Sequence, residues 1–265
     1  MAAFATAVRA HRAWGYPIRM VGREEFRRLE PHVAEPPEGA AFAACEGSVA
    51  PVAATRALLD AAGALGAVVV EGREVRGWRT RNGRVVGVET ADGAIAADHV
   101  VLAAGTASQA LARGLGVPLA MANSPGLLIH TEPAAPLLDR LVLAPGLHLK
   151  QDPGGAIVAG ADFGGGAAPD DPRREARRLL ARMRARLIGG EALALAAVTV
   201  GERVIPEGGL PVIGQPPGLA GLHLAVMHSG VTLAPLVGRL VADEVLDGVT
   251  ADLLAPFRPL APTMR

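Results

Sequence analysis

The segment "GLHLAVMHSGVTLAPLVGRLVADEVLDG", residues 221–248, constrains the fold more than any other part of the chain. Its first part predicts a strand at 222–226, and a tight His-Ser-Gly turn follows. Apolar residues at helical spacing then predict a helix from about 232 to 247. A strand that runs through a glycine turn into a helix is typical of α/β folds that bind a ligand at this point.

The start of that helix is open to an anion. Gly230 permits close approach of a ligand, and the first turn has neither a bulky nor an acidic side chain. The N–H groups of Val231, Thr232 and Leu233 carry the positive end of the helix dipole, which stabilises a phosphate or a delocalised anion on a heterocycle. The alternative is an ordinary surface helix capped by Ser229 or Thr232.

Composition favours a small-molecule or protein partner. Half of the 265 residues are apolar, and Lys plus Arg balance Asp plus Glu at 26 each. This balance gives no electrostatic reason for binding nucleic acid or an anionic membrane. The single cysteine, Cys45, excludes an internal disulfide, and no apolar run reaches the roughly 18 residues of a membrane span.

A second apolar run, His99 to Ala104, ends at Gly105 and leads into a predicted helix at 107–115. A run that is apolar on both faces indicates a central parallel strand. Ligands of open α/β sheets bind at the carboxyl ends of such strands, so Ala103, Ala104 and Gly105 are candidate ligand contacts.

The remaining patterns alternate between helix and sheet. Asn82-Gly83 and Asp92-Gly93 are strong hairpin signals. The strands expected around them lie near 67–70, 74–80, 84–90, 94–97 and 99–104. A helix is expected at 52–66 with Leu58, Leu59 and Ala62 on one face.

Residues 117–163 indicate a second sheet, with strands in "LLIHTE", "LHLKQD" and "AIVAGAD", and "FGGGAAPDDP" indicates a loop. Pro172 opens a helix whose apolar stripe includes Ala176, Leu179 and Met183. Seven arginines on its other faces favour a solvated surface over an anion site. The order of elements predicts two interleaved domains.

Five segments in order, "GREEFRRLEPHV", "EGSVAPVAATRALLDAAGALGAVV", "VVLAAGTAS", "ERVIPEGGLPVIG" and the segment at 221–248, resemble the FAD-dependent D-amino acid oxidase family, in particular its glycine oxidase and amino-acid dehydrogenase branch. The resemblance runs from about residue 20 to the end. It implies a mixed α/β fold in which a partial FAD-binding Rossmann-like domain (45–116 and 201–265) is interleaved with an antiparallel-sheet substrate domain (1–44 and 117–200).

The resemblance also implies roles for individual residues. Arg203 stands where the family holds the substrate carboxylate, and His228 and His148 are substrate-facing candidates; a hydrogen-bonded structural histidine is the alternative for both. His130 and Lys150 are weaker candidates. The implied cofactor contacts are Val75, Ala103, Ala104, Gly105, Gly230, Val231, Thr232 and Leu233.

The chain departs from the family pattern in two places. The family opens with a strand, a G-x-G-x-x-G turn and a helix, whereas these 265 residues contain no such turn; "GLGVP" at 114–118 and "GGG" at 164–166 are not substitutes. Gly208 stands before Gly209 where relatives tend to have an acid. No Walker, G-x-S-x-G or HExxH motif is present either, and the position of Cys45 argues against covalent flavin.

The expected function is FAD-dependent oxidative deamination of an amino acid or secondary amine, with hydride leaving the α-carbon. Its partners are the substrate and either an electron acceptor or a partner subunit. The alternative is a truncated or divergent member without bound FAD, acting as a subunit or an amino-acid-binding module. The basic N-terminus has the composition of a transit peptide, but Phe4, Val8, His11 and Trp14 favour an amphipathic helix of a cytoplasmic protein.

Overall fold

The computed structural model describes residues 2–161 and 171–262. The predicted loop in "FGGGAAPDDP" lies mostly outside these residues. The chain divides into two interleaved units, unit 1 at residues 1–54 and 125–201 and unit 2 at residues 55–124 and 202–265. The assignment of a substrate domain and an FAD-binding domain to these units stays a prediction.

Unit 1 contains a two-stranded sheet and a five-stranded sheet. α1 (Ala2–Ala13) precedes the antiparallel pair of β1 (Ile18–Gly22) and β2 (Gly39–Ala43), with α2 (Arg23–Leu29) between them. The larger sheet has the order β11-β7-β10-β9-β8. Its strands are β7 (Pro125–Thr131), β8 (Val142–Ala144), β9 (Leu147–Gln151), β10 (Ile157–Gly160) and β11 (Leu195–Glu202).

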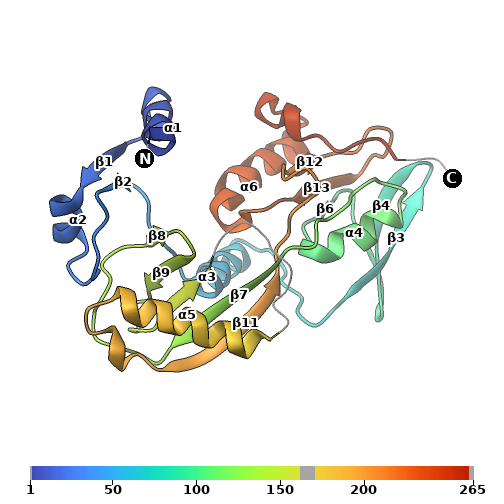
Figure 1. Ribbon diagram of the computed structural model, residues 1–265. Helices are drawn as coiled ribbons and strands as arrows, with labels where there is room; N and C mark the ends of the chain where they lie inside the picture. The colour runs from blue at the N-terminus through green and yellow to red at the C-terminus, as the bar shows by residue number, and fades with distance from the viewer. Residues whose placement is uncertain (1, 162–170, 263–265) are drawn as a thin grey trace. The chain divides into compact units, whose positions relative to one another are not determined.

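α5 (Pro172–Arg186) covers this larger sheet, as Figure 1 shows. Asp171 caps it by accepting a hydrogen bond from the Arg174 N–H at 2.9 Å, and Pro172 occupies the first turn. The predicted apolar stripe is confirmed, because Ala176, Leu179 and Met183 are all fully buried against the sheet. The short 3-10 helix η2 (Gly190–Ala192) then leads to β11.

The seven arginines of α5 are all exposed, so the predicted solvated arginine surface is confirmed. Two of them also contact neighbouring loops. Arg184 donates from Nε to the Leu193 carbonyl at 2.9 Å, and Arg182 donates to the Gly146 carbonyl at 3.2 Å.

Unit 2 contains an antiparallel meander and a small sheet with one parallel pair. β3 (Val75–Arg81), β4 (Arg84–Thr90) and β5 (Gly93–Ala96) form the meander. Asn82 and Gly83 both have positive φ, 50° and 73°, as a two-residue hairpin turn requires. β6 (Val100–Leu102), β12 (Val212–Gly214) and β13 (Leu222–Val226) form the second sheet, in the order β12-β13-β6.

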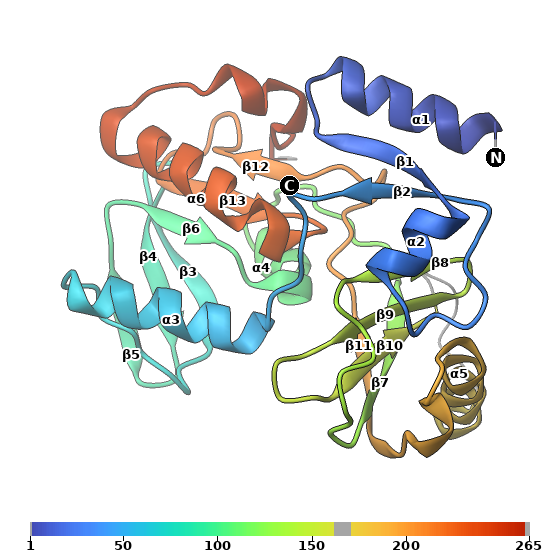
Figure 2. The same cartoon turned by 90° about the vertical axis from the view of Figure 1, so that its left-hand side faces the viewer.

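The helices of unit 2 differ in how many of their residues are buried. α6 (Gly230–Asp247) lies along β13, as Figure 2 shows, and buries Val237 and Val241. The 3-10 helix η1 (Gly105–Ala107) and α4 (Ser108–Arg113) follow β6, and the 3-10 helix η3 (Asp252–Phe257) follows α6. α3 (Pro51–Ala64), which crosses the boundary between the units, has no buried residue.

β13 separates two apolar cores in unit 2. Leu222, Leu224 and Val226 point to a core shared with the meander and α4, whereas Ala225 packs towards α6. Because side chains alternate along a strand, every second residue of β13 faces the same core. The carboxyl ends of β13 and β6 lie together because these two strands pair in parallel.

Two strand predictions need correction. Residues 67–70 form no strand in the structure, and Val68 is 86% exposed. β6 pairs in parallel as predicted, yet it lies at the edge of its sheet in the described residues and not at the centre. A β-branched run forms a strand only where a neighbouring strand satisfies its backbone, and the described residues supply none for 67–70.

Candidate functional site

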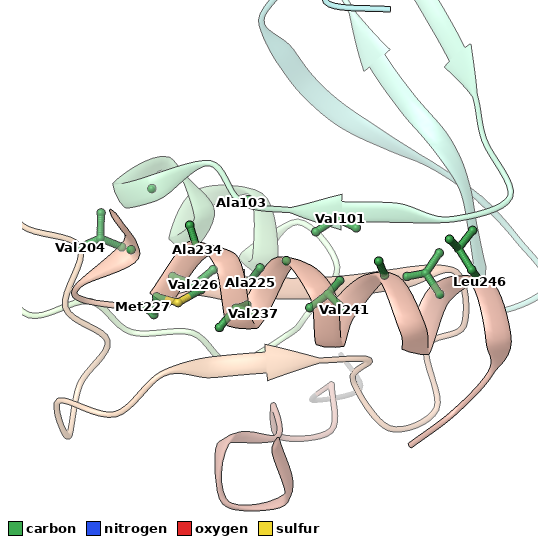
Figure 3. Close-up of a pocket in the computed structure, with 15 residues that line it drawn as sticks. Val101, Ala103, Val204, Ala225, Val226, Met227, Ala234, Val237, Val241 and Leu246 are labelled. Carbon is green, nitrogen blue, oxygen red and sulfur yellow. The ribbon is translucent and has the colours of Figure 1, made fainter. Parts of the chain in front are cut away.

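A cavity of about 650 Å³ lies in unit 2 between β6, β13 and α6. Figure 3 shows Val101 and Ala103 from the β6 segment and Ala234, Val237 and Val241 from α6 around it. Gly105, Val204, Met227 and Gly230 line it where the parallel strands end and α6 begins. The structure thus brings three of the predicted cofactor contacts, Ala103, Gly105 and Gly230, to one cavity.

The N-terminus of α6 has no side-chain cap. Ser229, the residue before the helix, adopts a left-handed conformation with φ 58° and makes no capping hydrogen bond. Its Oγ lies 2.9 Å from His228 Nδ1 instead. The alternative of a surface helix capped by Ser229 is therefore wrong, and the first amides keep their capacity to bind a ligand.

The first helical bond of α6 runs from the Leu233 N–H to the Ser229 carbonyl, at 2.9 Å. The amides without an intrahelical acceptor are consequently those of Gly230, Val231 and Thr232. The expectation that the Leu233 amide is available is wrong, because the helix starts two residues earlier than predicted. Leu233 packs its side chain into the core beneath α6.

Small residues leave space beside these amides. A Cβ on Gly230 would meet no heavy atom within 4 Å, and one on Gly105 would meet only Val204 Cγ2, at 3.6 Å. Gly105 also has φ +59°, a conformation that favours glycine. An apolar cavity with helix amides at one end suits a flat heterocycle that carries negative charge at its edge.

Arg203 follows β11 and is held by Ser124. Its backbone N–H donates to the Ser124 carbonyl at 2.9 Å, and its Nη1 donates to Ser124 Oγ at 3.5 Å. Ser124 is buried, Arg203 is half-buried, and the next residue, Val204, lines the cavity. Arg203 therefore directly precedes a residue of the cavity wall.

The histidine candidates occupy different environments. His228 is half-buried and follows Met227, which lines the cavity. His148 lies on β9 of unit 1, half-buried, and its role at a site in unit 2 stays a prediction. His130 and Lys150 already have partners in unit 1: His130 Nε2 lies 3.2 Å from Thr199 Oγ1, and Lys150 forms a 2.8 Å ion pair with Asp152.

The remaining predicted cofactor contacts lie outside the lining of the cavity. Val75 begins β3 and pairs with Thr90 in the meander, and Ala104 precedes η1. Val231 and Thr232 are exposed in the first turn of α6, where they offer backbone amides. Sequence reasoning missed Val204, Met227 and the apolar side of α6, although the spacing of Ala234, Val237 and Val241 was a readable signal.

A second polar cluster lies at the opposite end of α6. Arg258 donates to both carboxylate oxygens of Glu244, from Nη1 at 2.8 Å and from Nη2 at a shorter distance, and the Ala251 N–H donates to the same carboxylate at 3.0 Å. The Arg258 hydrogen bonds lower the pKa of Glu244. Burial lowers the pKa of the nearby His223, against the opposing effect of Glu244. This cluster ties the C-terminal segment to α6.

Residues 2–161 and 171–262 contain no helix whose length and apolar character would let it span a membrane. The same residues contain no group of three or more His, Cys, Asp or Glu side chains arranged to hold a metal ion.

Comparison with known proteins identifies relatives of this arrangement. The chain is 36% identical over 192 residues to the glycine oxidase of Pseudomonas aeruginosa, a match that covers 71% of this chain and 53% of the relative. It is 32% identical over 253 residues to the glycine oxidase of Geobacillus kaustophilus, covering 93% of this chain and 66% of the relative. The chain thus spans between about half and two thirds of the length of these relatives.

Solved structures share the fold. The crystal structure of the Geobacillus kaustophilus glycine oxidase matches with a TM-score of 0.84 and 29% identity, over 97% of this chain and 70% of that chain. The L-proline dehydrogenase of P. horikoshii matches with a TM-score of 0.80 and 22% identity, over 92% and 68%. The family described as "DAO: FAD dependent oxidoreductase" matches residues 1–244. The chain belongs to this family of FAD-dependent oxidoreductases.

Proposed function

We propose that this chain contributes the substrate-binding and flavin-facing part of an enzyme that oxidises an amino acid or a secondary amine bearing a carboxylate. FAD, when bound, supplies the acceptor for the hydride that leaves the α-carbon of the substrate. The observation that carries the proposal is the uncapped N-terminus of α6 at one end of an apolar cavity.

The residues around that end fit the reactive part of FAD. The Gly230, Val231 and Thr232 amides stabilise negative charge on a ring placed against them, because they carry the positive end of the helix dipole. Gly105 and Gly230 leave room for a planar group, and Ala103 and Val204 give it apolar contacts. The 265 residues contain no G-x-G-x-x-G turn, so the proposal assigns them no pyrophosphate contact.

Arg203 binds the substrate carboxylate in this proposal. A guanidinium offers a planar set of N–H donors that matches a carboxylate in two parallel hydrogen bonds. Ser124 holds both the backbone and the side chain of Arg203, which limits the rotamers that the guanidinium has to give up on binding. The α-carbon of the substrate is thereby oriented relative to the cavity.

His228 orients the substrate amine. Its Nδ1 is engaged by Ser229 Oγ, so when the serine hydroxyl donates, Nε2 carries the ring proton and is a donor. With the opposite tautomer, Nε2 accepts a hydrogen bond from an ammonium group.

Cofactor uptake tests the proposal. The purified chain is incubated with FAD, desalted, and examined for flavin absorbance and for quenching of flavin fluorescence. Anaerobic addition of glycine, sarcosine or D-proline should then bleach the flavin band. Protein that retains no flavin, or flavin that no amino acid reduces, would remove the proposed activity from this chain.

Substitution of Arg203 tests the carboxylate contact. Arg203→Ala should weaken substrate binding by about 2 kcal/mol or more, a loss of roughly thirtyfold, because a carboxylate loses its charged partner in a partly buried site. Arg113→Ala, which removes an exposed arginine at the end of α4, is the matched control and should change nothing. Equal substrate affinity in both variants would exclude Arg203 from the site.

The second candidate is an amino-acid-binding module without flavin, which the partly buried Arg203 beside Ser124 supports. In that case the chain binds amino acids through Arg203 alone. Calorimetry on the colourless protein, with and without added FAD, distinguishes the two candidates. Only the module binds amino acids with the same affinity in both cases.

A further inference from the structure

A polar cavity of about 660 Å³ lies in unit 2 at the C-terminal end of α6, opposite the amides of the candidate site. Gln215 and residues 245–250 form part of its wall. The charged or titratable side chains that line it are His99, His223, Glu244, Asp247 and Arg258. The proposed function uses none of these five side chains.

One carboxylate in this cavity fastens the C-terminal segment to α6. Glu244 accepts two hydrogen bonds from Arg258 and one from the Ala251 amide. Arg258 also donates to the Ala251 carbonyl at 3.2 Å. Only 6% of the Glu244 side chain is exposed. We call the arrangement of Glu244, Ala251 and Arg258 the carboxylate clasp.

The clasp lies directly against β12. Gly214, the last residue of β12, has φ +114°, and a Cβ at this position would overlap the Arg258 side chain. Glycine is therefore what lets the guanidinium reach Glu244. The 3-10 helix η3, between Ala251 and Arg258, packs against β12 and buries Leu254. The position of this whole segment thus depends on one acceptor.

His223 is the buried titratable group beside the clasp. It is 5% exposed, and its Nδ1 has no hydrogen-bond partner among the described residues. It shares the face of β13 that packs towards α6, because it stands two residues before Ala225. A protonated imidazole has two N–H donors, so the charged form would bury a donor without an acceptor. The clasped arrangement therefore favours the neutral ring.

The charges around His223 act in opposite directions. Burial lowers its pKa, Glu244 opposes this effect, and His99 and Arg258 reinforce it. The His99 ring lies 6.0 Å from the His223 ring, between centroids. Asp247, the other acid in the cavity wall, is exposed. Glu244 is thus the acid to which both the guanidinium and a protonated His223 are attracted.

We propose that Glu244 exchanges Arg258 for protonated His223 in acid, and that this exchange releases residues 251–258 from α6. At neutral pH the carboxylate holds Arg258 and the Ala251 amide. In acid it accepts a hydrogen bond from His223, which then has the acceptor that it lacks in the clasp. The proposal does not rest on the proposed function, because the release is measured without FAD or substrate.

The direction of the pH dependence follows from proton binding. In the clasp the pKa of His223 lies below its ordinary value of 6.5. In the released form Glu244 pairs with the charged ring, so the pKa is no longer lowered. The released form therefore binds one proton more between the two values. Its population should rise about tenfold for each pH unit that the pH falls below 6.5.

Hydrogen exchange on the full 265-residue chain measures the release. The Ala251 amide donates to Glu244 and the Leu254 amide donates to the Ala251 carbonyl, so both amides report on the clasp. Their protection factors should fall about tenfold per pH unit below about pH 6.5. Protection that stays constant from pH 7 to pH 5 would overturn the proposal.

A low concentration of urea distinguishes local release from unfolding of the unit. The Val85 amide, bonded to the Ala220 carbonyl, lies in the buried part of β4 and serves as the reference. Urea should speed exchange at Val85 and have little effect at Ala251 and Leu254, because release exposes little surface. The same sensitivity to urea at all three amides would overturn the proposal.

Two matched substitutions in the cavity identify the titrating ring. His223→Asn should make the protection of the Ala251 and Leu254 amides independent of pH between 7 and 5. His99→Asn removes the neighbouring imidazole and leaves His223 in place, so the pH response should persist. A response that survives His223→Asn, or one that His99→Asn abolishes, would overturn the proposal.

Substitution of the shared acceptor separates an exchange of partners from a simple effect of burial. Glu244→Gln leaves no carboxylate for the two cations to share, so the pH response at Leu254 should shrink. If burial alone made His223 sensitive to acid, the response should grow instead, because Glu244 opposes the lowering of its pKa. A larger response in Glu244→Gln would therefore overturn the proposal.

Discussion

The helix α5 of unit 1 and the helices α3 and α6 differ in how many of their residues are buried. α5 buries four residues against a five-stranded sheet, and Leu179 and Met183 are fully buried. α6 buries two residues beside a three-stranded sheet, and α3, which lies mostly in unit 2, buries none. α2 of unit 1 buries none either, so the contrast is between the α5 region and the region of α3 and α6.

This difference links folding to function. The open cavity of unit 2 contains the small residues and helix amides that suit a cofactor, so the candidate site lies beside a helix that buries only two of its residues. Exposed apolar surface destabilises a free domain, and ligand binding that covers it stabilises the domain. We test this contrast between the two regions with three predictions.

The largest expected effect compares the same substitution in the two environments. Leu179→Ala in α5 should lower the free energy of unfolding by about 2–5 kcal/mol, because it leaves a cavity in a close-packed core. Leu58→Ala in α3, where the side chain is 65% exposed, should stay within about 0.5 kcal/mol of the original protein. Urea denaturation measures both. A loss at Leu58 as large as that at Leu179 would show that α3 is covered after all.

A smaller effect is expected at the ion pair that fastens the C-terminal segment. Glu244→Gln should lower the free energy of unfolding by about 1–3 kcal/mol, because Arg258 and the Ala251 amide lose a charged acceptor. The folded-state pKa of Glu244 is lowered, so its contribution is present above the ordinary value of 4.5 and is lost as the pH falls through the lower folded value. Urea denaturation should show a smaller difference between the two proteins at pH 3 than at pH 7.

Local signals explain which elements the sequence made predictable. Asn82-Gly83 specifies its own turn, and Asp171 with Pro172 specifies the start of α5, so the meander and that helix follow from neighbouring residues. β1 and β2 were not predicted. Their pairing joins residues about 20 positions apart, and "GAAFA" lacks the β-branched side chains that mark a strand.

The glycines of the candidate site could be predicted from the sequence, whereas its apolar lining residues were harder to predict. Gly105 and Gly230 stood out because they follow the two predicted parallel strands, and both line the cavity. Val204 and Met227 carry no chemical signal, and only the fold brings them together. The availability of the Leu233 amide was wrongly predicted, because the start of a helix depends on the conformation of Ser229, which no residue pattern reveals.

The smallest predicted effect concerns acid sensitivity in unit 2. Burial lowers the folded-state pKa of His223, so the unfolded chain binds more protons below the ordinary value of 6.5, and stability falls as the pH drops through that value. His99, Glu244 and Arg258 are the charged or titratable groups around it. His223→Asn should flatten the pH dependence of unfolding below about pH 6.5. An unchanged pH profile in this variant would mean that His223 does not make unit 2 sensitive to acid.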